Sequence, residues 1–273
     1  GLFDFENSNI NNLEIENIIC DNKVLFTNSD MNSLIMKGLS SPKNRFTGLV
    51  DFTSARVNMI NISNSEFLDK LNFNNIDSID LTYFNGVDIN KFNICNSLIL
   101  NIFKDSVFLN ITELLLDKVK LVSTATEEQI NLKSININEF KCNKLSILQD
   151  LNFEEMKISH FAIVNSNIEK VFRIKYSEIE ETIFVDTTFE DLQIIDNKND
   201  DSSKKREIKL KNTTIKSTVL DKLKLDNFKM RDAHVSDAKI GYVNFNKGSR
   251  ETNRFFKNYY DSISDYITAD RYY

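Results

Sequence analysis

The residues best suited to chemistry in this chain are paired carboxylates. Adjacent acids occur at Glu127-Glu128, Glu154-Glu155, Glu180-Glu181, Glu190-Asp191 and Asp200-Asp201. Two carboxylates can act as acid and base in the cleavage of a glycosidic bond. Neighbouring residues on a β-strand point to opposite faces, however, and a chain with 40 acidic residues is expected to contain such pairs by chance. The sequence therefore predicts no catalytic residue and no enzyme.

The histidines and cysteines form no metal or redox motif. The two histidines, His160 and His234, are not spaced as metal ligands with each other or with a cysteine. The three cysteines, Cys20, Cys95 and Cys142, are far apart and odd in number, which is typical of free thiols in a reducing compartment. Phosphate-binding glycine loops and serine-nucleophile motifs are absent. We expect neither a metal nor a cofactor.

The charge is distributed unevenly along the chain. Residues 1–200 contain 30 acidic and 18 basic residues, whereas residues 201–273 contain 10 acidic and 16 basic ones. An acidic body would repel phosphate, so we expect no direct binding of nucleic acid. No signal peptide and no apolar run of about eighteen residues is visible. The chain begins with Gly rather than Met, and we interpret it as a piece of a longer protein.

A repeat in residues 71–94 indicates the elements that position these side chains. The segment divides into three lines of eight residues, LNFNNIDS, IDLTYFNG and VDINKFNI. Apolar residues follow one another in steps of two and three, which fits neither a helix nor one long strand. Short strands joined by tight corners, with the same face always inward, give this pattern. The predicted inward residues are Leu71, Phe73, Ile76, Ile79, Leu81, Phe84, Val87, Ile89, Phe92 and Ile94.

The unit apolar–Asp/Asn–apolar recurs through most of the chain, for example at Val87-Asp88-Ile89, Leu109-Asn110-Ile111 and Ile135-Asn136-Ile137. Its polar middle residue is expected to point outward and to form ladders between stacked coils. If one coil takes three lines of eight, residues 1–248 would make about ten coils. The predicted fold is an all-β, right-handed parallel β-helix, a β-solenoid whose hand follows the usual crossover rule. Irregularly spaced LxxLxL-like strings leave a leucine-rich solenoid as the alternative.

Three segments interrupt the repeat and are predicted to be loops: 40–48, 123–129 and 196–207. The last contains a basic run, Lys204, Lys205 and Arg206, which is a candidate interaction site. After Gly248 the apolar spacing becomes helical, and Ser249 is a suitable N-cap. We therefore divide the chain into a solenoid domain, 1–248, and a C-terminal helix, 249–273. This helix is expected to cap the last coil.

Within the C-terminal helix the aromatic residues Phe255, Tyr259 and Tyr260 are further candidate interaction residues. The expected cap would cover the edge of the last coil and would be held by packing of such rings.

Units such as Leu71-Asn72-Phe73 and Leu151-Asn152-Phe153 resemble those of the pentapeptide-repeat proteins, a family of right-handed β-helices. The resemblance covers most of residues 3–245. In that family a small residue two places before the central Leu or Phe lets four walls close around a narrow core. Here that place holds Leu, Ile, Val or Phe, so we expect a wider cross-section, and the sequence leaves a three-sided and a four-sided coil open.

The sequence Ala269-Asp270-Arg271-Tyr272-Tyr273 is similar to a segment that follows the repeats in some bacterial pentapeptide-repeat proteins. A membrane-spanning region often comes next in those proteins. The resemblance implies a cytoplasmic solenoid belonging to a membrane protein, with membrane contact through the region after residue 249. The basic balance of residues 201–273 is compatible with that position.

Three functions remain open at this stage. The first is a non-catalytic scaffold that binds an unknown protein partner, as the cytoplasmic domain of a larger bacterial membrane protein. The second is a mimic of DNA that inhibits a nucleic-acid enzyme, which the resemblance to pentapeptide-repeat proteins implies. The third is a carbohydrate-binding or carbohydrate-active β-helix, which would carry a groove with converging carboxylates and aromatic rings.

Overall fold

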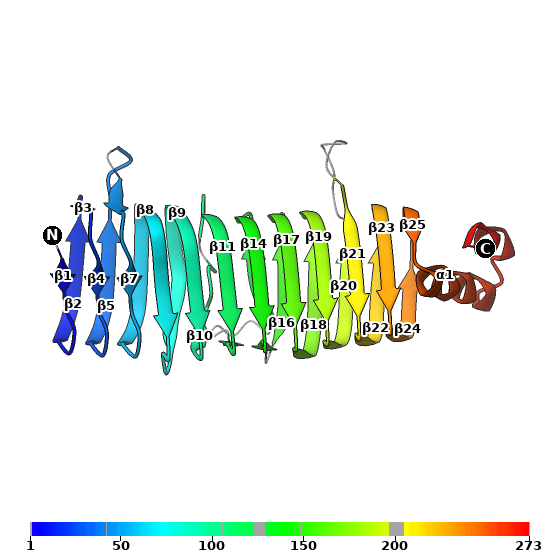
Figure 1. Cartoon of the computed structure of the whole chain (residues 1–273), viewed down its shortest axis with the longest axis horizontal. Helices are drawn as coiled ribbons and strands as arrows, with labels where there is room; N and C mark the ends of the chain where they lie inside the picture. The colour runs from blue at the N-terminus through cyan, green and yellow to red at the C-terminus, as the bar shows by residue number, and fades with distance from the viewer. Residues whose placement is uncertain are drawn as a thin grey trace.

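The chain forms one parallel β-solenoid with helices at its C-terminal end (Figure 1). The computed structural model describes residues 2–41, 43–104, 106–122, 129–147, 149–196 and 205–272. In the described residues the strands wind through about 11 coils, so the predicted fold class is confirmed and the predicted ten coils were close. The leucine-rich alternative is wrong, because the coils between residues 3 and 248 contain strands and no helix in the described part.

The strands run in chain order as β1 (Phe3–Asp4), β2 (Asn9–Glu16), β3 (Ile19–Cys20), β4 (Val24–Leu25), β5 (Asp30–Lys37), β6 (Asn44–Phe46), β7 (Val50–Asp51), β8 (Arg56–Asn74), β9 (Ile79–Cys95), β10 (Leu98–Leu100), β11 (Asn110–Asp117), β12 (Lys120–Val122), β13 (Gln129–Lys133), β14 (Asn136–Asn143), β15 (Ser146–Ile147), β16 (Asp150–Glu154), β17 (Lys157–Val164), β18 (Asn167–Lys175), β19 (Glu178–Val185), β20 (Thr188–Ile195), β21 (Glu207–Lys211), β22 (Thr214–Asp221), β23 (Leu223–Arg231), β24 (His234–Ile240) and β25 (Val243–Gly248). The helical segments are α1 (Arg250–Ser262), α2 (Tyr266–Ala269) and the 3₁₀ turn η1 (Asp270–Tyr272).

The coil is shorter than the sequence suggested. In the regular part of the solenoid, equivalent residues of neighbouring coils differ by 21 in number, as Leu145 and Ser166 do. The difference falls to 20 between Arg206 and Asp226. It rises to 26 between Asp186 and Asn212, where a segment is inserted. The predicted coil of three eight-residue lines is wrong, because the eight-residue spacing of residues 71–94 is local and does not recur in the regular coils.

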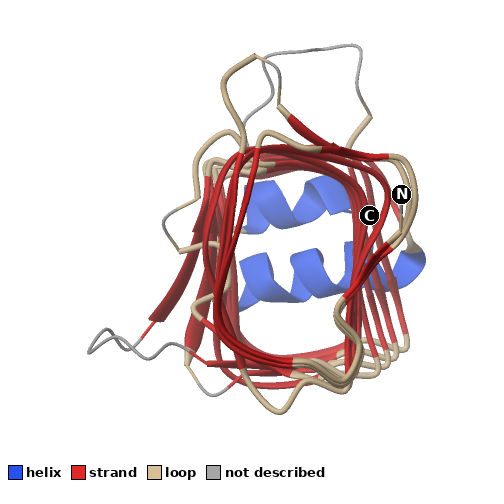
Figure 2. Cartoon of the chain, turned by 90° about the vertical axis from the view of Figure 1, so that its left-hand side faces the viewer, coloured by secondary structure: helices blue, strands red, loops and turns tan. Residues whose placement is uncertain are grey.

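Each coil has four walls, the four-sided of the two shapes that the sequence left open (Figure 2). Two corners are made by residues in the left-handed conformation, such as Glu155 and Asn165. The other two corners are bends inside strands, where one residue leaves the hydrogen-bonded ladder between coils. In β17, for example, Ile158 and His160 pair with residues of the next coil, but Ser159 between them does not. The result is two long walls and two narrow ones. Large inward residues fit this four-sided coil because small ones, such as Ser166, occupy its corners.

The core is a column of side chains whose spacing follows these walls. All ten residues predicted to point inward between 71 and 94 are buried. Over residues 153–168 the buried positions alternate in steps of three and two, so the underlying period is five rather than eight. The apparent eight in 71–94 arises where a corner takes an additional residue. Aromatic rings stack along the column, for example Phe26 on Phe52 at 4.6 Å and Phe140 on Phe161 at 4.8 Å between ring centroids.

Hydroxyl groups connect the corners of neighbouring coils. Ser166 is 5% exposed; its Oγ donates to the carbonyl of Val164 at 2.9 Å and accepts from the N–H of Leu145 in the preceding coil at 3.0 Å. Ser97 bonds in the same way to Cys95 and Ile76. Because the corner N–H groups are enclosed by the next coil, these hydroxyls supply the acceptor that water cannot.

The three predicted loops have different outcomes. Within 40–48, Asn44–Phe46 forms β6, because Phe46 points into the core and is fully buried. Most of the other two segments lies outside the described residues.

The C-terminal helix caps the last coil, as predicted. Ser249 Oγ accepts from the N–H of Thr252 at 3.1 Å and so caps α1. Phe256 and Tyr260 are buried against the coil end. No helix in the described part of the chain is long and apolar enough to cross a membrane.

Candidate functional site

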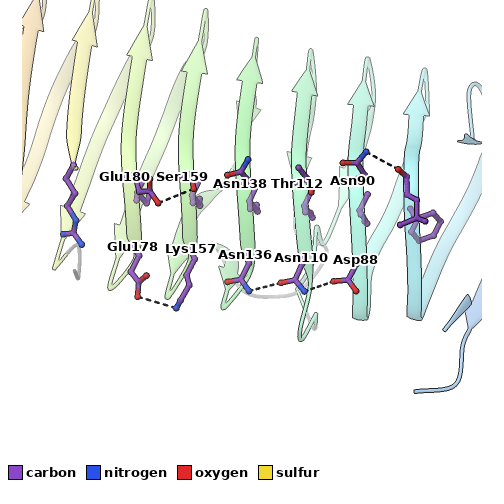
Figure 3. A pocket seen from close by; sticks show the side chains of 18 residues that line it. Asp88, Asn90, Asn110, Thr112, Asn136, Asn138, Lys157, Ser159, Glu178 and Glu180 are labelled. Carbon is purple, nitrogen blue, oxygen red and sulfur yellow. Dashed lines mark hydrogen bonds and ion pairs between the residues drawn. The ribbon is translucent and has the colours of Figure 1, made fainter. Parts of the chain in front are cut away.

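A groove of about 650 Å³, lined by polar side chains and by isoleucines between them, runs along one narrow wall of the solenoid (Figure 3). Its floor consists of five stacked segments, one from each of five coils: 88–90, 110–112, 136–138, 157–159 and 178–180. The middle residue of each segment is an isoleucine that points into the core. The two flanking residues of each segment point outward, so the groove presents two parallel rows of side chains.

The first row begins with a ladder of amides. It runs through Asp88, Asn110, Asn136, Lys157 and Glu178 (Figure 3). Asn110 Nδ2 donates to Asp88 Oδ1 at 2.7 Å, and Asn136 Nδ2 donates to Asn110 Oδ1 at 2.9 Å. Lys157 Nζ lies 3.6 Å from Glu178 Oε1. The predicted outward ladder of Asp and Asn is therefore confirmed along this wall.

The second row is more varied in chemistry. It contains Asn90, Thr112, Asn138, Ser159 and Glu180 (Figure 3). Asn90 Nδ2 donates to the carbonyl of Leu68 at 3.1 Å, and Ser159 Oγ donates to Glu180 Oε1 at 3.4 Å. The two rows together offer amide donors, amide and hydroxyl acceptors, and charges of both signs.

Basic residues lie at both ends of the groove. At one end Lys43 Nζ lies 2.6 Å from Asp88 Oδ2 and 4.0 Å from Glu66 Oε1. Partial burial alone would raise the pKa of Asp88, but the hydrogen bonds from Lys43 and Asn110 and the charge of Lys43 outweigh it, and the pKa lies below its ordinary value. At the other end lies Arg206. The groove thus has a basic residue near each of its two ends.

Of the basic run predicted as an interaction site, the structure describes Lys205 and Arg206. Lys204 lies outside the described residues, and Lys205 is exposed. Arg206 is 4% exposed; its N–H donates to Asp226 Oδ2 at 2.9 Å, and its carbonyl accepts from the N–H groups of Asp226 and Asn227. Arg206 therefore anchors the chain where it re-enters the coil, and it also lines the end of the groove.

The aromatic candidates lie in the cap, away from the groove. Tyr260 is buried, and burial together with the neighbouring Tyr272 and Tyr259 raises its pKa to about 12. Tyr259 Oη accepts from the N–H of Ile240 at 3.0 Å, and Phe255 lies against Phe256 with ring centroids 5.3 Å apart. Tyr259 thus connects α1 to β24, while Tyr260 packs against Tyr259 and Tyr272 within the cap.

The adjacent acids Glu180 and Glu181 do not face each other in the groove. Glu180 lies in the groove, whereas its neighbour Glu181 lies on the next wall with Lys209 at 2.5 Å and His160 at 2.9 Å. Both acids point outward, and they lie on different walls because β19 bends at Glu180, which leaves the ladder between Ile179 and Glu181. Across the described residues no group of three or more His, Cys, Asp or Glu side chains is placed to hold a metal ion.

Sequence reasoning did not identify the groove as a site. The signal was present in the units around Asp88, Asn110 and Asn136, but it resembled the other outward ladders. Searches against protein-family models, curated proteins and solved structures found no match.

Proposed function

We propose that this chain is a non-catalytic binding solenoid whose groove holds an extended segment of a partner protein. The observation that carries the proposal is the double row of polar side chains along one wall, over five stacked coils. Hydrogen bonds between coils hold Asp88, Asn110 and Asn136, so these side chains lose little conformational entropy when a ligand binds.

The dimensions and chemistry of the groove suit a peptide. Five stacked segments span about 19 Å at the usual strand spacing, which corresponds to about six residues of extended chain. Asn110, Asn136 and Asn138 offer both donors and acceptors to peptide groups. Lys157 and Glu178 offer charges of both signs within the same groove.

The same ion-pair pattern weighs against mimicry of DNA. A DNA mimic needs a continuous acidic stripe. On the long wall beside the groove, lysines stand between the acids instead: Lys209 contacts Glu181 and Glu207, and Lys229 contacts Glu207.

The family and cellular setting are also proposals. Burial with a period of five supports a relationship to the pentapeptide-repeat solenoids. The ADRYY ending and the basic balance of residues 201–273 support a cytoplasmic domain of a bacterial membrane protein.

A peptide selection tests the binding function. A phage-displayed library of random dodecapeptides is selected on the whole chain, and the affinity of an enriched synthetic peptide is measured by calorimetry. Asn136→Ala removes the central amide of the groove. Asn72→Ala is the matched control, because Asn72 donates to Asp51 at 2.8 Å in a ladder on another wall.

We expect Asn136→Ala to weaken the peptide at least tenfold and Asn72→Ala to leave its affinity unchanged. Equal affinity for all three proteins would refute the peptide groove. A failure to enrich any peptide, combined with binding on a glycan array that Asn136→Ala abolishes, would favour the carbohydrate alternative instead.

A further inference from the structure

The corner beside the groove carries two exposed aromatic residues in a strained backbone conformation. This corner, which we call the groove corner, directly precedes the floor segments; four of its successive residues are Phe108, Ser134, Glu155 and Tyr176. Phe108 has a φ of 56° and Tyr176 a φ of 51°. Phe108 is 78% exposed and Tyr176 is 40% exposed.

Large aromatic residues are unfavourable at such positions. The left-handed region is occupied mainly by Gly, Asn and Asp, because a bulky side chain clashes with its own backbone there. Most left-handed residues of this chain are indeed Asn, Asp or Ser. Phe103 is also left-handed, but it is 2% exposed and its ring lies 5.4 Å from that of Phe84 and 5.7 Å from that of Phe92 in the core.

Packing in the core thus offsets the strain at Phe103, whereas Phe108 and Tyr176 leave much of their rings in solvent. Val107, beside Phe108, is also 50% exposed. Strain retained at an exposed aromatic residue is a recognised mark of a functional position, and exposed aromatic side chains are common anchors in protein interfaces.

We infer that Phe108 and Tyr176 are anchor residues that bind two large apolar side chains of the segment held in the groove. The inference rests on the proposed function and specifies the partner. The two residues are three coils apart on the same corner, about 14 Å at the usual strand spacing. That distance corresponds to about four residues of extended chain, so the partner carries large apolar residues at positions i and i+4.

The corner between the two anchors is polar. Ser134 Oγ donates to Glu155 Oε2 at 3.1 Å, and Lys133 Nζ lies 3.7 Å from the same carboxylate oxygen. The residues between the two apolar positions of the partner therefore face amides, hydroxyls and charges, and they are polar themselves.

The test uses variants that remove the ring and relieve the strain in one step. Phe108→Asn and Tyr176→Asn place a residue that tolerates the left-handed conformation at each anchor. Lys144→Asn is the matched control, since Lys144 is exposed, has a φ of 55° and lies on the other left-handed corner. The probe is the peptide enriched from the dodecapeptide library, and both its affinity and the urea unfolding midpoint are measured.

We expect Phe108→Asn and Tyr176→Asn each to weaken the peptide about tenfold or more without lowering the unfolding midpoint. Lys144→Asn should leave the affinity unchanged. Wild-type affinity in both anchor variants, with Asn136→Ala still weakened, would overturn this inference and leave the groove in place. Peptides enriched on the Phe108→Asn protein should also lose the apolar pair at i and i+4; retention of that pair would count against the anchors.

Discussion

The corner hydroxyls are the feature whose removal gives the most specific structural prediction. In Ser166→Ala, the N–H of Leu145 loses its acceptor at 3.0 Å while remaining enclosed between coils. The carbonyl of Val164 loses the hydroxyl as well, but it still accepts from the N–H of Lys144 at 3.1 Å. The variant therefore leaves one buried donor unpaired and one acceptor satisfied.

A buried donor without a partner costs about 1–3 kcal/mol. Because a solenoid is stabilised mainly by contacts between neighbouring coils, the cost should appear first as local opening around residues 140–147. A change of that size raises the rate of amide exchange through local opening by about 5- to 150-fold.

Hydrogen–deuterium exchange read by mass spectrometry measures this directly on peptides from the two coils. Ser166→Thr is the control, because Thr187 fills the same place in the next coil and its Oγ1 donates to the carbonyl of Val185 at 2.8 Å. Exchange in Ser166→Ala equal to that of the wild type would show that the hydroxyl does not support the corner.

Three further predictions follow from the core, the corners and the outer ladders. Phe161→Ala removes a fully buried ring that stacks on Phe140, and it should lower the free energy of unfolding by about 3–5 kcal/mol in urea titrations; a loss below about 1 kcal/mol would contradict the packed column. Lys118→Asn places a residue that favours the left-handed conformation at a φ of 53°, and it should stabilise the fold by up to about 1 kcal/mol and so raise the unfolding temperature. A lower unfolding temperature would contradict the assignment of that corner. The hydrogen bond from Lys209 holds the pKa of Glu181 below its ordinary value, so its stabilisation is present above about pH 4.3 and is lost as the pH falls through the lowered pKa. Glu181→Gln should therefore lose less stability than the wild type between about pH 5 and pH 3, and an identical pH profile would refute that contribution.

The inward face of the coil could be read from the sequence because it depends on local spacing alone. Steps of two and three in residues 71–94 identified ten buried side chains correctly. The cap at Ser249 followed from equally local rules. The length and shape of the coil could not be predicted from local spacing, since both depend on where insertions fall and on small residues such as Ser166 at the corners.

The groove could not be predicted for a related reason. Which outward ladder becomes a groove depends on the register between coils and on what bounds the wall at each end. The offset between neighbouring coils changes irregularly, from 26 between Asn110 and Asn136 to 21 between Ser159 and Glu180. The sequence therefore did not show that these side chains share one wall. Because of the same irregular spacing, the sequence did not show that Phe108 and Tyr176 lie on the same corner.

Photo-crosslinking tests the central claim, that the groove is the binding surface, most directly. A photoreactive amino acid replaces Thr112 in the groove or, as the control, Asn93 on the adjoining long wall, and each protein is irradiated with the enriched peptide. The account predicts that the peptide is captured at position 112 and not at position 93. Equal capture at both positions, or capture at 93 alone, would contradict it.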